Sequence, residues 1–171
     1  MANVNYANRG RSFEELIEYA NEQYKAKGVA LVQKVATPWT VIREGKQIVS
    51  AFPAEKSTVD YIGVTKINDG TVPLAFDAKQ CKLKTSFPLK NIEQHQLDFL
   101  AAWRFQGGTS FVIIEMTTLG KIYKVEFEVI ARYWWLGTIA GGAKSIPIKD
   151  FAKFKAVGQA GGIVLDYLEL Y

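Results

Sequence analysis

The stretch Val72-Pro-Leu-Ala-Phe-Asp-Ala-Lys79 decides the fold of this chain. Its side chains alternate with a period of two, which is the spacing of a β-strand whose successive residues point to opposite faces. The apolar face carries Leu74, Phe76 and Ala78. Asp77 and Lys79 then share the other face of a strand predicted over residues 71–79. A carboxylate after such an apolar run is costly to bury unless a cation meets it, so this pair is a candidate site.

A second acidic residue belongs to the preceding strand. Residues 57–64 predict that strand, and the turn residues Asn68-Asp69-Gly70 connect it to the next one. If the two strands are neighbours, Asp60 lies close to Asp77 and Lys79. Two carboxylates can hold a divalent metal against a phosphodiester, and a lysine beside them can stabilise the charge that develops on the phosphate. The group predicts a metal-dependent nuclease site. The alternative is a surface ion pair of Lys79 with Asp60, which contributes little to stability.

The rest of the pattern predicts an α/β fold. A helix begins at Ser12 and ends at Gly28, and the capping-box pair Ser12 and Glu15 leaves Glu14 free to point elsewhere. Asn91 is expected to cap a second helix with Gln94 as its partner. The other expected elements are strands at 28–35, 111–114 and 121–129, a hairpin at 41–49, a helix at 131–136 and an amphipathic segment at 147–154. This order indicates one α/β domain over residues 1–171, with a mixed sheet flanked by helices and an unassigned tail from Gly158.

Composition limits the classes of protein. With 171 residues, 49% of them hydrophobic, the chain can form one domain with a substantial core. No apolar run approaches the ~20 residues that span a bilayer, and the first residues lack the basic start and apolar centre of a signal peptide. The single cysteine, Cys81, excludes an internal disulfide and a cysteine-based zinc site. We expect no membrane association and a cytoplasmic location, or the host cytoplasm if the chain is phage-encoded.

Basic residues gather around the acidic pair. The formal net charge is +4, and the lysines near the acids in sequence are Lys79, Lys82, Lys84 and Lys90. Arg9 and Arg11 flank a glycine near the start of the chain. A metal site ringed by lysines suits a polyanionic substrate, although for any single lysine a solvated surface position is the alternative.

A set of motifs follows one order along the chain. They are Asn8-Arg9-Gly10-x-Ser12-x-Glu14-Glu15, Ser57-Thr58-x-Asp60-Tyr61, Phe76-Asp77-Ala78-Lys79, Lys84-Thr85-Ser86-Phe87-Pro88-Leu89 and His95-Gln96, followed by Gly107-Gly108-x-x-Phe111-Val112-Ile113-Ile114 and Lys144-Ser145-Ile146. This order resembles the RecU-type Holliday junction resolvases over residues 6–154. The Arg9-Gly10-x-x-x-Glu14 pattern is also similar to the archaeal junction resolvases. Both groups have the restriction-endonuclease-like nuclease core, so the resemblance implies that core here.

The resemblance implies a role for each matching residue of the site. Asp60 and Asp77 would bind Mg²⁺, for which Mn²⁺ can substitute, with Thr58 and Gln96 contributing to the metal site. Lys79 would stabilise the transition state. Glu14 would reach the same site from the first helix, as in the archaeal enzymes.

The resemblance also implies how DNA is bound and cut. Lys82, Lys84 and Ser86 would grip the DNA backbone next to the cut, as would Arg9 and Arg11. Hydrolysis would leave a 5′-phosphate. Symmetric cuts across a four-way junction need two active sites related by a two-fold axis, so a homodimer is expected.

The chain departs from the family in two places. The family usually has Glu where this chain has Asp77, which shortens the reach of the carboxylate by one methylene. The segment 37–56 is shorter than the family's stalk, which enters the junction centre, and is expected to form a short protruding hairpin. Trp39 or Phe52 in this segment could wedge at the junction centre, or could pack in a dimer interface or a core.

The function expected from the sequence is a Mg²⁺-dependent, structure-selective endonuclease that resolves Holliday junctions, with recombinase proteins as further candidate partners. One alternative is a branched- or flap-DNA nuclease with the same core. Another is a non-catalytic, DNA-binding recombination accessory protein, in which Asp60, Asp77 and Lys79 would form a structural ion pair.

Overall fold

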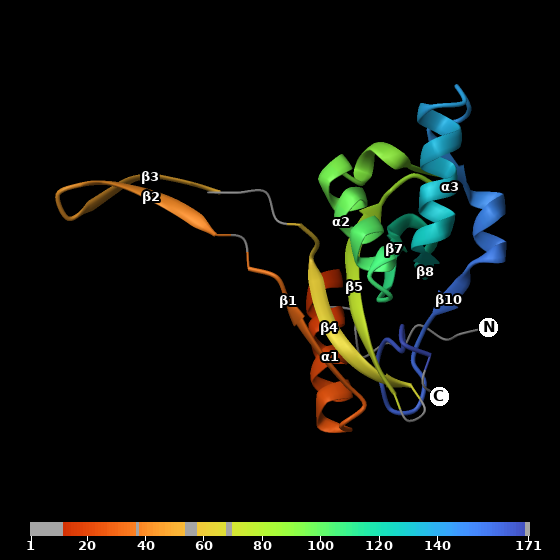
Figure 1. The fold of residues 1–171 in the computed structure, drawn as a ribbon, viewed down its shortest axis with the longest axis horizontal. Coiled ribbons are helices and arrows are strands. Elements are labelled where there is room, and N and C mark those ends of the chain that lie inside the picture. The colour runs from red at the N-terminus through yellow and green to blue at the C-terminus, as the bar shows by residue number, and fades with distance from the viewer. Residues whose placement is uncertain (1–11, 37, 54–57, 68–69, 170–171) are drawn as a thin grey trace.

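A six-stranded sheet forms the centre of the computed structural model, which describes residues 12–36, 38–53, 58–67 and 70–169 (Figure 1). The strands, in order across the sheet, are β1 (Ala30–Lys34), β4 (Tyr61–Ile67), β5 (Gly70–Cys81), β7 (Thr109–Met116), β8 (Lys121–Glu126) and β10 (Lys155–Val157). Neighbouring strands are antiparallel except β5 and β7, which are parallel. The expected mixed sheet is confirmed.

Helices cover both faces of this sheet. On one face lies α1 (Phe13–Ala26), which buries Phe13, Ile17, Ala20 and Tyr24 at helical spacing against the β5 and β7 side chains Leu74, Phe76 and Phe111. On the other face lie α2 (Gln94–Phe105) and α3 (Phe127–Thr138), whose Leu97, Leu100 and Ile130 pack with Ala75, Val112 and Ile114. The alternation predicted for β5 is therefore confirmed, because its two sets of side chains enter two different cores. None of the helices in the described ranges is long and apolar enough to cross a membrane.

Short elements complete the second face. β6 (Ser86–Pro88) pairs with β9 (Ser145–Pro147) in a small antiparallel ladder. Among the described residues, 3₁₀ turns lie at η2 (Leu89–Asn91), η3 (Thr117–Leu119) and η4 (Ile148–Lys153). Phe87 and Ile146 of the ladder are fully buried in the same core as α2, so this ladder anchors the segment that follows β5.

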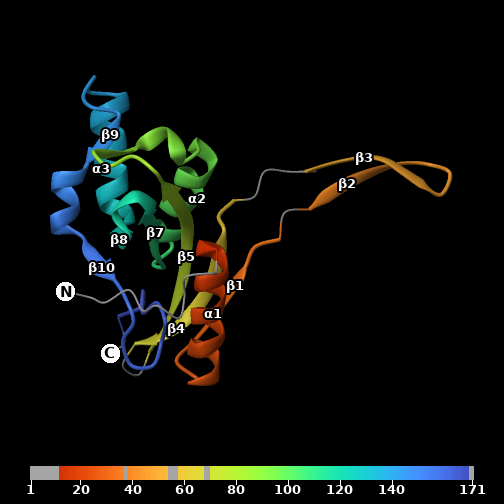
Figure 2. The ribbon, with the colours of Figure 1, turned by 180° about the vertical axis from the view of Figure 1, so that it is seen from behind.

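A β-hairpin projects away from the sheet. Its strands are β2 (Trp39–Glu44) and β3 (Gln47–Pro53), and Gly45 at the turn has a φ of 61°, which favours glycine. All side chains of β2 are exposed, and both views show the hairpin standing clear of the body (Figures 1 and 2). Trp39 and Phe52 are 60% and 46% exposed, which excludes a core position within this chain. The expected protruding hairpin is confirmed.

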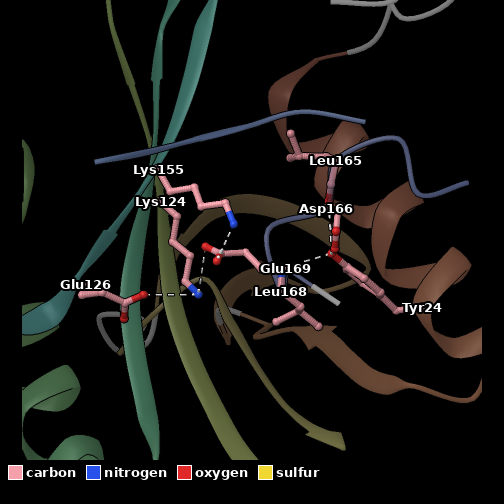
Figure 3. Close-up of polar contacts among 8 residues, drawn as sticks. All are labelled: Tyr24, Lys124, Glu126, Lys155, Leu165, Asp166, Leu168 and Glu169. Carbon is pink, nitrogen blue, oxygen red and sulfur yellow. Dashed lines mark hydrogen bonds and ion pairs between the residues drawn. The ribbon is translucent and has the colours of Figure 1, made fainter. Parts of the chain in front are cut away.

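The tail after β10, unassigned from the sequence, belongs to the core beneath α1. Ile163, Leu165 and Tyr167 are buried with the apolar face of that helix. The Tyr24 hydroxyl donates to Asp166 Oδ1 at 2.8 Å and accepts from the Leu168 amide at 3.1 Å (Figure 3). Glu169 pairs with Lys155 at 2.8 Å and with Lys124 at 3.9 Å. The tail therefore fastens α1 to the far edge of the sheet.

Several predicted boundaries are wrong, among them the start of the helix expected at 131–136, which spans Phe127–Thr138. The helix α2 is capped by Glu93 with Gln96 as its partner, not by Asn91 with Gln94, because Asn91 ends a 3₁₀ turn and the buried Ile92 separates it from the helix. The strand predicted over 121–129 ends at Glu126, and Phe127 begins α3. The strand predicted from residue 57 begins at Tyr61. The turn residues Asn68 and Asp69 lie outside the described residues.

Candidate active site

The two aspartates face each other where β4 begins and β5 passes it. Tyr61 is paired with Phe76, so Asp60, the residue before β4, lies opposite Asp77. The Asp60 amide donates to Asp77 Oδ1 at 3.2 Å, and the Ala78 amide donates to Asp60 Oδ2 at 2.9 Å. These reciprocal bonds fix the position of both carboxylates. The register of β4 against β5 brings Asp60 and Asp77 together, as the sequence predicted.

The carboxylate of Asp77 is buried, which is unfavourable for its ionised form. Its side chain is 0% exposed. Burial, followed by the hydrogen bond and the negative charge of Asp60, raises the pKa of Asp77 to about 7, and the nearby Lys79 ammonium opposes this rise. The ammonium of Lys79 therefore does not offset the combined effect of burial and Asp60 on the pKa of Asp77.

Lys79 lies beside the pair on the same face of β5. Its ammonium is 3.0 Å from Asp77 Oδ2, and its side chain is 17% exposed. Within the described ranges, this ammonium is the group that meets the buried Asp77 Oδ2. The arrangement places a cation at the carboxylates while leaving the ammonium within reach of a ligand at the surface.

These residues fit a divalent cation. A buried carboxylate oxygen without a hydrogen bond, beside a second carboxylate, supplies the hard oxygen ligands that Mg²⁺ and Mn²⁺ take. No group of three or more His, Cys, Asp or Glu side chains that could hold a metal occurs within the described residues. Within the described residues, Asp60 and Asp77 are the acids that meet at this candidate site.

The two other expected metal ligands have different surroundings. Thr58 is exposed and precedes the buried Val59 by one residue. Gln96 is buried, and its Oε1 accepts a hydrogen bond from the Glu93 amide at 3.0 Å in the capping box of α2. The amide oxygen of Gln96, the atom that would bind a metal, thus has a structural partner in this conformation.

Glu14 lies in the first turn of α1 with its carboxylate exposed. The predicted capping box is confirmed, because Glu15 Oε2 accepts from the Ser12 amide at 2.7 Å while the Ser12 hydroxyl accepts from the Glu15 amide. Glu14, free of the cap, accepts a hydrogen bond from Lys34 at 2.6 Å. Glu14 thus points to the end of β1, which borders Asp60.

The expected DNA-binding residues are described in part. Lys82 and Lys84 are exposed in the loop between β5 and β6, and Ser86 is half-buried at the start of β6. The loop is held at one end, since the Thr118 hydroxyl donates to the Lys82 carbonyl at 2.6 Å. Arg9 and Arg11 lie outside the described residues.

Sequence reasoning missed Lys34 and Tyr61. Lys34 is the last residue of β1, its register partner is Tyr61, and the next amide, of Val35, donates to the Asp60 carbonyl at 2.8 Å. The available signal was a lysine ending a predicted strand immediately before the hairpin. That signal identifies a site residue only after the pairing of β1 with β4 is known.

Comparison with known proteins places the chain in a family. Residues 8–171 match RecU, described as Recombination protein U. The Holliday junction resolvase RecU of Geobacillus sp. (strain WCH70) is 35% identical over 156 residues, which cover 88% of this chain and 75% of that protein. The protein of that name from Levilactobacillus brevis is 37% identical over 157 residues, covering 88% of this chain and 76% of the relative. A solved structure, the Holliday junction resolvase Hjc of Archaeoglobus fulgidus, aligns with a TM-score of 0.37 at 12% identity, covering 66% of this chain and 77% of that one. By the match along nearly its whole length, the chain belongs to the RecU family.

Proposed function

We propose that this chain is a divalent-metal-dependent endonuclease that resolves four-way DNA junctions by paired phosphodiester cuts. The observation that carries the proposal is the contact of Asp77 with both Asp60 and Lys79 where β4 begins beside β5. The relatives named Holliday junction resolvase support the choice of substrate. The cation is Mg²⁺, with Mn²⁺ as a substitute, and the chain acts as one nuclease domain in the cytoplasm.

Asp60 and Asp77 would hold the cation, with Thr58 as a nearby hydroxyl. Gln96 would join them only if its amide oxygen left the capping box of α2. When bound, the cation would activate a water and neutralise charge on the scissile phosphate. Glu14 would approach the same site from α1 after leaving Lys34.

The chain's own residues supply the remaining requirements of the reaction. Lys79, already held at the carboxylates, would stabilise the added negative charge of the transition state, because a fixed ammonium needs no reorganisation as that charge develops. Lys82, Lys84 and Ser86, with Arg9 and Arg11, would bind backbone phosphates and so fix the position of the cut strand. The exposed hairpin would enter the junction centre, and a homodimer would present two sites to the two strands. Recombinase proteins are candidate partners.

The proposal is tested with three labelled substrates: a mobile four-way junction, a flap and a linear duplex, each with Mg²⁺ or with EDTA. Paired symmetric nicks in the junction alone, dependent on the metal, are expected. Lys79→Ala should bind the junction as the unchanged protein does and cut it at least about 100-fold more slowly, the loss typical for one electrostatic group.

Other outcomes separate the alternatives. Preferential cutting of the flap would indicate a branched-DNA nuclease. Binding of the junction without cleavage under any divalent metal would indicate a non-catalytic accessory protein. Normal cutting by Lys79→Ala would show that the active site lies elsewhere.

A further inference from the structure

The ammonium of Lys34 lies between two acids of α1. Its Nζ is 2.6 Å from Glu14 Oε2 and 3.4 Å from Glu18 Oε1, and the two acids are one helical turn apart. All three side chains are about half exposed, at 46%, 62% and 48% for Lys34, Glu14 and Glu18. Ion pairs at such exposure contribute little to stability, so Lys34 can change partners at small cost.

Lys34 lies where the hairpin leaves the sheet. It ends β1, and the adjacent Val35 amide binds the Asp60 carbonyl at 2.8 Å. The end of β1 therefore lies between the hairpin and the backbone of Asp60, so DNA bound by the hairpin and cut at Asp60 and Asp77 would lie near Lys34. Lys34 thus presents a cation at the base of the hairpin, beside the strand that Asp60 leads into.

A buried hydroxyl next to this lysine has no partner. Tyr61 is directly opposite Lys34, so the two side chains lie on the same face of the sheet. The Tyr61 ring is 0% exposed and stacks on Phe76 with centroids 4.9 Å apart. Its hydroxyl has no hydrogen-bond partner in the part of the chain that the structure describes. Burial raises the pKa of Tyr61, and the charges of Glu18 and Glu14 add to the rise, in keeping with the closeness of these carboxylates.

We infer that Lys34 is a DNA-phosphate contact that Glu14 and Glu18 mask in the DNA-free protein. When Lys34 transfers to a phosphate, one α1 carboxylate is left to accept a hydrogen bond from the Tyr61 hydroxyl. The inference rests on the proposed function for its substrate. In the DNA-free protein the Tyr61 hydroxyl has no hydrogen-bond partner among the described residues, and in the DNA-bound protein it donates to the α1 carboxylate. The exchange releases Glu14 only when a phosphate is in place, which makes the α1 acid available to the metal site after DNA has bound.

The first test measures binding of a labelled four-way junction in EDTA, where cutting does not occur. Glu18→Gln should tighten binding about threefold, because it weakens the mask. Lys34→Met should weaken binding and lower the slope of log affinity against log salt by about one, the loss of one phosphate contact. The matched control is Glu22→Gln, which removes the same charge from an exposed position one turn further along α1.

A variant that combines Lys34→Met with Glu18→Gln separates masking of Lys34 from general charge repulsion. With Met at position 34, Glu18→Gln should have no more effect than Glu22→Gln, since Glu18 acts through Lys34. If Glu18→Gln tightens binding equally with and without Lys34, general charge repulsion explains the effect and the mask is refuted. An unchanged salt slope in Lys34→Met would equally overturn the phosphate contact.

The Tyr61 step has its own readout. Tyr61→Phe keeps the stacked ring and removes only the buried hydroxyl, so the free protein should be at least as stable as the unchanged one in urea unfolding. Junction binding in EDTA should nevertheless weaken about twofold to threefold, although a fully buried side chain cannot touch DNA. Unchanged binding by Tyr61→Phe would refute this step.

Failure of the proposed function gives a different result. A protein that binds the junction but never cuts it would refute the proposed nuclease activity. The binding comparison between the Lys34 and Glu18 variants would still test the inference. A protein that binds no junction would refute both.

Discussion

At the scale of the residue, Asp77 combines full burial with a neighbouring carboxylate, and both raise its pKa. The chain tolerates this because the backbone amides of Asp60 and Ala78 and the ammonium of Lys79 hold the two carboxylates in place. An acid whose pKa is higher in the folded than in the unfolded protein makes folding less favourable once the pH rises above its unfolded value. The buried carboxyl of Asp77 therefore lowers the free energy of unfolding at neutral pH.

The pH dependence of unfolding tests this. The folded pKa of Asp77 is about 7 against an ordinary value of 3.8, so stability should fall as the pH rises from about 4 to 7 through this residue. Asp77→Asn cannot ionise, so its free energy of unfolding relative to the unchanged protein should rise by on the order of 2 kcal/mol between pH 5 and pH 8. Urea unfolding in EDTA at the two pH values measures the difference. Because the loss of the Lys79 partner affects both pH values, a difference that stays constant with pH would contradict the raised pKa.

The sequence was sufficient for part of the site. Period-two alternation placed Asp77 and Lys79 on one face, and an assumed antiparallel neighbour brought Asp60 to them. It was insufficient for Lys34 and Tyr61, because their contact depends on the register of β1 against β4. It was also insufficient for Gln96, whose amide oxygen serves the α2 cap that had been assigned to Asn91 and Gln94.

At the scale of the element, the hairpin β2–β3 is separate from the core. Its described side chains are exposed, and its strands pair with each other in their own two-stranded sheet. An element of this kind adds little to the stability of the body, and its exposed aromatic residues are available for a ligand.

Replacement of residues 38–53 by a short Gly-Ser linker should therefore leave Tm within about 3 °C of the unchanged protein, because no core contact is lost. Preference for the junction over linear duplex should fall at least about tenfold in competition binding. A matched variant, Trp39→Ala with Phe52→Ala, keeps the hairpin and removes its aromatic side chains. If the linker variant keeps its preference, junction selectivity lies in the body and not in the hairpin.

The elements that could be predicted were those with local signals. The Ser12–Glu15 cap, the hairpin expected at 41–49 and the alternation of β5 are short-range patterns, and each is confirmed. The end of β8 was not predictable in this way, since Phe127 and Val129 continue the alternation while packing as helix residues against the core. The tail was not assignable because it forms no regular strand or helix, and its place in the core depends on distant partners such as Tyr24.

At the scale of the whole molecule, the chain contributes the one candidate active site described above, whereas resolving a four-way junction requires cuts in two strands. A homodimer would supply the second site, and each subunit would then act on one strand. Mixed dimers test this expectation. Dimers of the unchanged chain with a tagged Lys79→Ala chain should nick a single strand of each junction, at about half the total yield of cuts, because only one subunit retains its ammonium. Denaturing gels of a doubly end-labelled junction measure the cuts, and sedimentation confirms the dimer. Paired cuts by purified mixed dimers would refute one site per strand.

The packing of the tail on α1 also constrains how the chain can be made. Tyr24 binds Leu165 and Asn21 binds Tyr167, so the contacts join positions 141 and 146 residues apart. A ribosome synthesises α1 before these partners, at about 5–20 residues per second. The apolar face of the nascent helix is therefore without these partners for roughly 7–30 s, an interval in which exposed apolar surface favours aggregation.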